Sequence, residues 1–398
     1  MQLNDLLSNL SNKDWMKYLI RKSEVYLVGG SVRDIFLNKP SKDIDIVVDG
    51  LSVKKILDIL QFFGKASVEG ESFAVIKFKP QNQKEIIDIA VPRIDKKIGK
   101  GHKGFEVVTD GVNIEDDLKR RDFTINSIAV NIETGEILDP FNGIGDIKDK
   151  LISATNVDTF RDDPLRILRG IQFAARFGFE IDPETLYMMK QDAHLIKEIS
   201  GERILDELMK IIHKEGDTQI AINLIHRTNV DQALFNKKML KYDKGFENLD
   251  EISFFYMLGL IGDQDPANFY KNRLKGKVPI ENALRVLDNL FTMWLKLSSE
   301  EDKRYLVFQS IKRSPLILNV TIFPKDFDDI ILDMRTNKIP MKSSDIQING
   351  DDIINIGNIK ESQIVGHILE KIYRDALMNR FKWKLRGHSI EYLKKLLS

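Results

Sequence analysis

The stretch that decides the fold runs from Tyr26 to Val48, "YLVGGSVRDIFLNKPSKDIDIVV". It begins as an apolar strand, turns at Gly29 and Gly30, continues with the pattern of a short helix, and returns to a second apolar strand. Asp43 and Asp45 lie in that second strand, where residues two apart share a face. Charged side chains are rarely buried unless they are paired or bind a metal, so the two carboxylates need a partner.

Mg²⁺ is the partner that these two carboxylates suggest. It prefers hard oxygen ligands and keeps phosphate oxygens in its remaining positions, so Asp43 and Asp45 are candidate metal ligands and catalytic residues. In a two-metal site, one ion activates the attacking oxygen and the other stabilises the leaving one. Asp88, in "EIIDIAV", is a candidate for a third ligand from another predicted strand. The alternative is an acidic edge strand that faces solvent.

The glycine pair adds a predicted phosphate site. Gly29 and Gly30 let the backbone approach a ligand closely, and Ser31 begins a helix whose N–H groups attract phosphate. Arg33 adds a positive charge. Together these residues predict a bound triphosphate beside the metals, although a Gly-Gly-Ser segment alone also fits a plain turn. The chain contains no Walker loop.

A second unusual stretch is "DLKRRDFTINSIAVN", which covers residues 117–131. It places charged residues at the edge of an apolar segment. We expect Arg121 to bind triphosphate oxygens, Asp122 to accept a ribose hydroxyl, and Asn126 to donate to a phosphate. The alternative is a surface cluster of salt bridges.

A third stretch, "DDPLRILRG", carries candidate base-reading residues. Pro164 suits the first position of a helix, and Asp163 and Arg166 are then neighbours on one face. A carboxylate beside a guanidinium complements the pairing edges of cytosine and adenine and leaves groups unpaired opposite uracil and guanine. Arg169 extends this face toward the triphosphate. The alternative is that Asp163 only caps the helix.

The composition is that of an ordinary multidomain globular protein of 398 residues. Lys+Arg and Asp+Glu both total 60, so any basic surface must be local. The absence of cysteine excludes disulfides and thiolate zinc sites. No signal-like start and no membrane-length apolar run is present, which predicts a cytoplasmic protein with no membrane contact.

The chain is predicted to be an α+β protein, with a small α/β head on a long helical remainder. Four regions are expected, at residues 1–150, 151–215, 216–340 and 341–398. The polar segment Arg93–Glu106 is predicted to be a mobile loop, and Ile137–Lys150 is predicted to be a hinge.

Five stretches in order resemble the motifs of the class II, bacterial-type tRNA nucleotidyltransferase and poly(A) polymerase family. They are "LVGGSVRDIFLNKPSKDIDIVV", "RRDFTINSIA", "DPFNGIGDIKDKLI", "RDDPLRILRGIQFAARFGF" and "ISGERILDELMKII". The resemblance implies a nucleotidyltransferase head with a mixed sheet, followed by an all-helical neck, body and tail at the boundaries above. Asp163 and Arg166 match the family's E-D-x-x-R motif, whose leading Glu is replaced here by Asp162.

The resemblance also implies a function. The expected activity is template-independent addition of C, C and A, from CTP and ATP with Mg²⁺, to the 3′ end of tRNA; no protein partner is predicted. The acceptor arm would be the macromolecular partner, with Lys382, Lys384 and Arg386 of the tail meeting its phosphates; a solvated helix face is the alternative for these three.

Other activities stay open at this point. The family also contains enzymes that add only C or only A, and poly(A) polymerases. In the family a loop at the place of Arg93–Glu106 accompanies A addition, and it is not shortened here, which disfavours a CC-only enzyme. A catalytically inactive tRNA-binding protein and a small-molecule nucleotidyltransferase are further alternatives.

Overall fold

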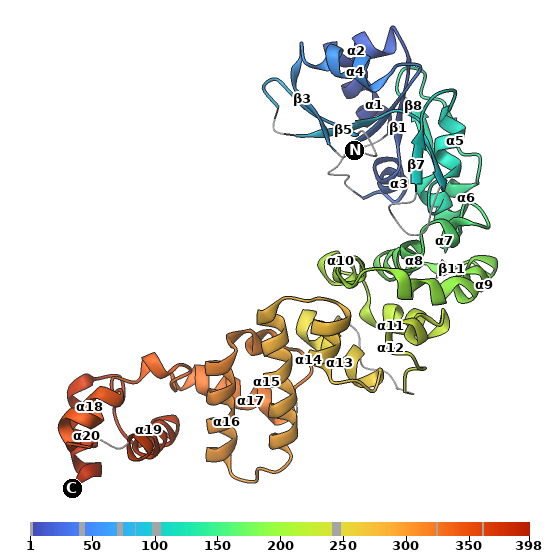
Figure 1. Cartoon of the computed structure of the whole chain (residues 1–398). Coiled ribbons are helices and arrows are strands. Elements are labelled where there is room, and N and C mark those ends of the chain that lie inside the picture. The colour runs from blue at the N-terminus through green and yellow to red at the C-terminus, as the bar shows by residue number, and fades with distance from the viewer. Residues whose placement is uncertain are drawn as a thin grey trace. The chain divides into compact units, whose positions relative to one another are not determined.

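The computed structural model describes residues 3–39, 44–69, 75–83, 85–97, 105–240, 248–323, 325–359 and 362–398. The chain forms two compact units, Met1–Lys238 and Met239–Ser398. Figure 1 shows that the large sheet belongs to the N-terminal part of the first unit and that the chain after it is mostly helical. The predicted α+β class is confirmed.

The head is built on a seven-stranded sheet with the order β3-β4-β5-β2-β1-β8-β9. β2 and β5 are parallel, and every other neighbouring pair in this sheet is antiparallel, so the sheet is mixed as predicted. Its strands are β1 (Glu24–Val28), β2 (Asp45–Asp49), β3 (Gly64–Glu69), β4 (Val75–Pro80), β5 (Ile87–Ala90), β8 (Ala129–Asn131) and β9 (Ile137–Leu138).

Helices cover both faces of this sheet. One hydrophobic cluster joins Tyr26 and Val28 of β1 and Val47 of β2 to Ile114 and Leu118 of a helix. Because side chains alternate along a strand, Asp45 shares the face of Val47 and lies at the end of this cluster. The helices of the head are α1 (Leu3–Ser11), α2 (Asp14–Ile20), α3 (Gly30–Phe36), α4 (Val53–Leu60), α5 (Ile114–Lys119), the short η1 (Thr124–Asn126) and α6 (Gly143–Asp149).

Two segments differ from the prediction. The ends of the expected loop Arg93–Glu106 are strands, β6 (Ile94–Lys97) and β7 (Phe105–Val108), which pair antiparallel as a separate ribbon. The expected hinge at 137–150 is structured as well, since it contains β9 and α6. In the second segment, Gly143 and Gly145 lie within α6 and do not prevent the helix from forming.

The helices after the head follow the predicted apolar spacing. α8 (Leu165–Phe177) and α10 (Gly201–His213) pack together, and each buries an apolar stripe. Pro164 was predicted at the first position of α8, but it is the N-cap, so the helix begins one residue later, at Leu165. The other elements of this part are β10 (Leu151–Ile152), α7 (Thr159–Asp162), β11 (Glu180–Ile181), α9 (Pro183–Asp192), η2 (Ala193–Glu198), α11 (Thr218–Arg227) and α12 (Val230–Phe235).

The second unit is helical throughout its described residues. Its core is rich in aromatic side chains; Phe255, for example, packs edge-on against Phe254 and Tyr270. Its elements are α13 (Glu251–Ile261), α14 (Pro266–Asn268), η3 (Phe269–Arg273), α15 (Val278–Trp294), α16 (Glu300–Arg313), η4 (Pro315–Asn319), α17 (Lys325–Thr336), η5 (Ser343–Asp345), α18 (Gly350–Gly357), α19 (Ser362–Leu377) and α20 (Arg386–Leu397). Across the described parts of both units, no helix is long and apolar enough to cross a bilayer.

Candidate active site

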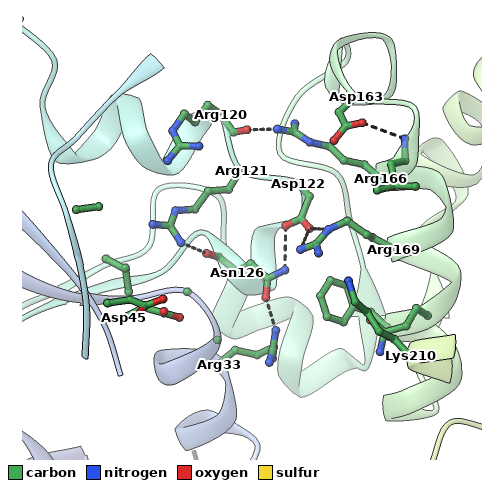
Figure 2. A pocket seen from close by; sticks show the side chains of 18 of the residues that line it. Arg33, Asp45, Arg120, Arg121, Asp122, Asn126, Asp163, Arg166, Arg169 and Lys210 are labelled. Carbon is green, nitrogen blue, oxygen red and sulfur yellow. Dashed lines mark hydrogen bonds and ion pairs between the residues drawn. The ribbon is translucent and has the colours of Figure 1, made fainter. Parts of the chain in front are cut away.

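A cavity of about 790 Å³ lies between the sheet, α8 and α10 (Figure 2). It gathers side chains from segments that are far apart in the sequence. Of the predicted head and neck residues, Asp43 lies outside the described residues, and Ser31 does not line the cavity. The others all line it: Gly29, Gly30, Arg33, Asp45, Asp88, Arg121, Asp122, Asn126, Asp163, Arg166 and Arg169.

The glycine turn lies against Asp45. Gly29 has φ +65°, a left-handed conformation that glycine adopts without strain. A Cβ atom at Gly29 would lie 2.8 Å from Nη1 of Arg121 and 3.6 Å from Oδ2 of Asp45. A side chain at this position would therefore displace the Arg121 guanidinium, in addition to requiring a left-handed backbone conformation. Ser31 supports this arrangement from behind, because its buried hydroxyl accepts the backbone N–H of Asp45 at 2.9 Å.

Asp88 lies beside Asp45 but has a partner of its own. The two residues are opposite each other in the parallel pairing of β2 and β5. Both oxygens of Asp88 accept from Nζ of Lys77, at 2.7 and 2.6 Å. Among the described residues, no group of three or more histidine or acidic side chains gathers as a metal cluster. Asp88 therefore contributes to a metal site only if it shares its oxygens with Lys77.

Asp122 is the centre of a buried hydrogen-bond network, visible in the middle of Figure 2. Its Oδ1 accepts from Asn126 Nδ2 at 2.9 Å, and its Oδ2 pairs with Arg169 at 2.6 Å. The network continues to Arg33, whose Nη1 donates to Asn126 Oδ1 at 2.6 Å. Asp122 and Asn126, predicted to contact ribose and phosphate, thus bond to protein groups. Their roles toward a ligand stay predictions.

Two buried aspartates are kept ionised by arginines. Burial disfavours the charge of Asp122, but Arg169, Asn126 and Arg166 outweigh it and lower its pKa. Asp117 behaves in the same way: burial raises its pKa, while Arg121 and Arg120 lower it further than burial raises it. Asp117 also fixes both guanidinium groups, at 2.6 Å to Arg120 and 2.9 Å to Arg121.

The candidate base-reading pair lies at the start of α8. Oδ1 of Asp163 accepts the N–H of Leu165 at 3.2 Å, as a capping residue would, and its Oδ2 is 3.6 Å from Arg203. Arg166 donates to the carbonyl of Arg120 at 2.7 Å and to the hydroxyl of Thr159 at 3.2 Å. A carboxylate can accept several hydrogen bonds and a guanidinium has five N–H donors, so both groups keep capacity for a ligand.

Sequence reasoning did not assign a role in this cavity to several of the residues that line it. Arg120 and Asp117 could have been paired from their i, i+3 spacing. No local sequence pattern indicated a role in the cavity for five others: Arg93, Gln172, Arg176, Lys210 and Lys214. Counted over all its described lining residues, the cavity carries ten basic and seven acidic side chains, a surplus of three positive charges that suits a polyanion.

The three tail residues belong to the second unit. Lys382 and Lys384 are exposed, and Nζ of Lys384 lies 4.9 Å from the ring centroid of Trp383. Arg386 is paired with Asp352 at 2.6 Å, which reduces its capacity to meet a phosphate.

Two family models match the chain. Residues 25–153 match the poly(A) polymerase head domain, and residues 178–242 match the probable RNA- and SrmB-binding site of polymerase A. These two stretches therefore carry the head and RNA-binding domains of poly(A) polymerases, as the sequence motifs predicted. The head model runs from Val25 in β1 to Ser153 just after β10, and it includes Asp45 and Asp122.

Solved structures share the fold over the whole chain. A CCA-adding enzyme of Bacillus stearothermophilus in complex with CTP is 19% identical, with a TM-score of 0.71, and the match covers 100% of this chain and 98% of that one. The Thermotoga maritima enzyme complexed with tRNA is 21% identical, with a TM-score of 0.69 and coverage of 100% and 99%. A CCA-adding enzyme with ATP is 23% identical, with a TM-score of 0.70 and coverage of 100% and 98%.

The Asp122 network predicts a specific pH dependence of stability. Replacing Asp122 by Asn leaves Arg169 without its ion-pair partner and should cost about 3 kcal/mol of unfolding free energy at pH 7. The lowered pKa makes this contribution complete above the unfolded-state value near 4, and it is lost as pH falls through the folded-state pKa. The gap between wild type and Asp122→Asn should therefore shrink at about pH 3.

Trp15, the one tryptophan of the first unit, can report this unfolding in urea in a background carrying Trp294→Phe and Trp383→Phe. Asp149→Asn, at an exposed position of α6, is the control and should change little at either pH. A gap that is small at pH 7, or that stays constant with pH, would contradict the account.

Proposed function

We propose that this protein adds C, C and A to the 3′ end of tRNA without a template, using CTP and ATP. In each step the 3′-hydroxyl of the tRNA loses its proton to solvent, and its oxygen bonds to the α-phosphorus of the nucleotide. The bond between that phosphorus and the bridging oxygen of the β-phosphate breaks, and pyrophosphate leaves. A cytoplasmic site of action is part of the proposal, because its substrate is tRNA.

The observation that carries the proposal is the combination of groups in one cavity. The catalytic candidate Asp45 lines its sheet side, a net positive lining suits a triphosphate, and Asp163 and Arg166 lie at the start of α8. Each feature alone fits a structural role. Their convergence in a family of nucleotidyltransferases favours an enzyme over a binding protein, since a protein that only holds RNA has no need for a carboxylate at a glycine turn.

Residues of this cavity fit a divalent cation, for which we propose Mg²⁺. The Asp45 carboxylate offers hard oxygen donors beside the glycine turn, and Asp43 and Asp88 are the candidates to complete the ligand set. When bound, such ions lower the pKa of the attacking hydroxyl and neutralise charge on the leaving group. The chain's own task is to hold the triphosphate with Arg33 and Arg121 and to aim its α-phosphate at the incoming hydroxyl.

Selection of the base falls to Asp163 and Arg166 in this proposal. Asp163 would accept from the exocyclic amine of cytosine or adenine, and Arg166 would donate to the neighbouring ring nitrogen. The Leu165 N–H and the Arg203 guanidinium hold the Asp163 carboxylate in place. The carbonyl of Arg120 and the hydroxyl of Thr159 hold the Arg166 guanidinium. With uracil or guanine, the Asp163 carboxylate would face a carbonyl oxygen and the Arg166 guanidinium would face a ring N–H. Such unpaired groups reduce binding free energy more than missing apolar contacts do.

Replacing Asp45 by Ala should abolish nucleotide addition, because it removes the carboxylate beside the α-phosphate, while tRNA binding stays within about twofold of wild type. Asp43→Ala should behave alike. Single-turnover extension and a filter-binding assay with labelled tRNA measure the two effects. Appreciable turnover in Asp45→Ala would remove this carboxylate from catalysis. Asp149→Ala serves as a folded control.

Replacing Asp163 by Ala should reduce discrimination against UTP and GTP by about tenfold or more, because the acceptor that excludes them is gone. Competition between CTP and UTP on a tRNA that lacks CCA measures this change. Asp163 also accepts the Leu165 N–H, so a pure capping role predicts lower stability with unchanged selectivity. Asp163→Ser, which can still cap the helix, separates the two roles: it should restore stability but not selectivity.

A further inference from the structure

Basic side chains without an assigned role gather at the C-terminal end of α8. Arg176 lies in its last turn, and Lys214 follows the end of α10; both line the cavity together with Arg33 and Lys210. Arg33 is paired with Asp34, and Lys210 with Glu207 at 2.7 Å. Over the described ranges of the chain, Arg176 and Lys214 have no ion-pair partner.

Two aromatic rings contact the guanidinium groups of Arg33 and Arg176 without neutralising them. Phe173 and Phe177 are stacked, with centroids 5.9 Å apart. The guanidinium of Arg33 lies 5.2 Å and 5.1 Å from the two centroids, and that of Arg176 lies 4.9 Å from Phe177. Aromatic faces attract cations but carry no net charge, so the positive charge of the group remains available to a ligand.

The like charges disfavour one another in the present arrangement. The pKa of Arg176 is lowered by burial and by Arg33, with a partial offset from Asp34. Burial also lowers the pKa of Lys214, and Arg176, Lys210 and Arg33 lower it further. A polyanion placed among these groups would relieve the repulsion, which is how a cluster of cations binds phosphates strongly.

The position of the cluster along α8 indicates which part of the nucleotide it meets. Arg166, Arg169, Phe173 and Arg176 follow i, i+3 and i+4 spacings and share one stripe of the helix. Arg166 and Arg176 are ten residues apart, or about 15 Å along the axis. With the base at Arg166, an extended nucleotide that follows this stripe past Arg169 and Arg33 brings its terminal phosphates to Arg176.

We propose that Arg176 and Lys214 form the subsite for the β- and γ-phosphates and for the pyrophosphate that leaves. This inference rests on the proposed function and adds two binding residues to it. α8 then spans the whole nucleotide, with base recognition at its start and phosphate recognition at its end. The subsite helps to bind every incoming triphosphate equally, so it contributes affinity but no choice between bases.

The double variant Arg176→Gln/Lys214→Gln tests this subsite in the full-length protein. Calorimetric titration with Mg²⁺ present should show pyrophosphate and CTP binding weakened by about tenfold for each charge removed. Binding of CMP, which lacks the two outer phosphates, should stay within about twofold. The preference for CTP over UTP in the extension assay should not change. Lys190→Gln, at an exposed position of α9, is the matched control.

The possible results separate the subsite from the function as a whole. Equal losses for CMP and CTP would point to structural damage and overturn the inference, as would unchanged pyrophosphate binding. Weaker tRNA binding with normal pyrophosphate binding would assign the cations to the RNA backbone and also overturn it. A wild-type protein that binds neither CTP nor pyrophosphate would instead contradict the proposed function. The conservative variant Arg176→Lys should retain most of the pyrophosphate affinity.

Discussion

The ion pair between Asp122 and Arg169 is the interaction on which the cavity depends. Asp122 follows α5 at the edge of the head, whereas Arg169 lies in the middle of α8, and their 2.6 Å contact joins the two segments. Through Asn126 the same carboxylate is linked to Arg33 beside the glycine turn. A buried pair that loses one partner leaves an uncompensated charge, so the network favours one relative placement of the head and α8.

The acidic side chains of the cavity serve different purposes. Asp117, Asp122 and Glu207 are buried and fix the geometry of arginines and lysines. Asp45 and Asp163 instead lie in different walls of the cavity, one on the sheet and one on the turn before α8. Because the basic residues outnumber the acids, the wall between them suits the phosphates of a nucleotide. The buried acidic side chains also explain how so many arginines are tolerated close together.

Local patterns predicted the part of this site that lies within short stretches. The strand, glycine turn, helix and second strand from Tyr26 to Val48 follow from apolar periodicity, and the same periodicity identified α8 and α10. The internal hydrogen bonds of Asn126 and the approach of Arg176 to Lys214 depend on tertiary packing, which residue spacing does not encode. The β6–β7 ribbon was missed because its strands are only four residues long and lie in a segment whose lysines and glycines are typical of a loop. Asp43 lies outside the described residues, so the proposed set of metal ligands is based on the sequence and on the position of Asp45.

Single-nucleotide extension of three tRNAs that end before CCA, after C and after CC tests the central claim most directly. Each is incubated with Mg²⁺ and with CTP alone, ATP alone or both. The account predicts two C's and then one A, followed by a stop. Addition of A alone to the CC-ended tRNA would mean a specialised A-adding enzyme, and an A ladder on any RNA would mean a poly(A) polymerase. No extension of any of the three tRNAs would contradict the proposal that this cavity catalyses nucleotide transfer.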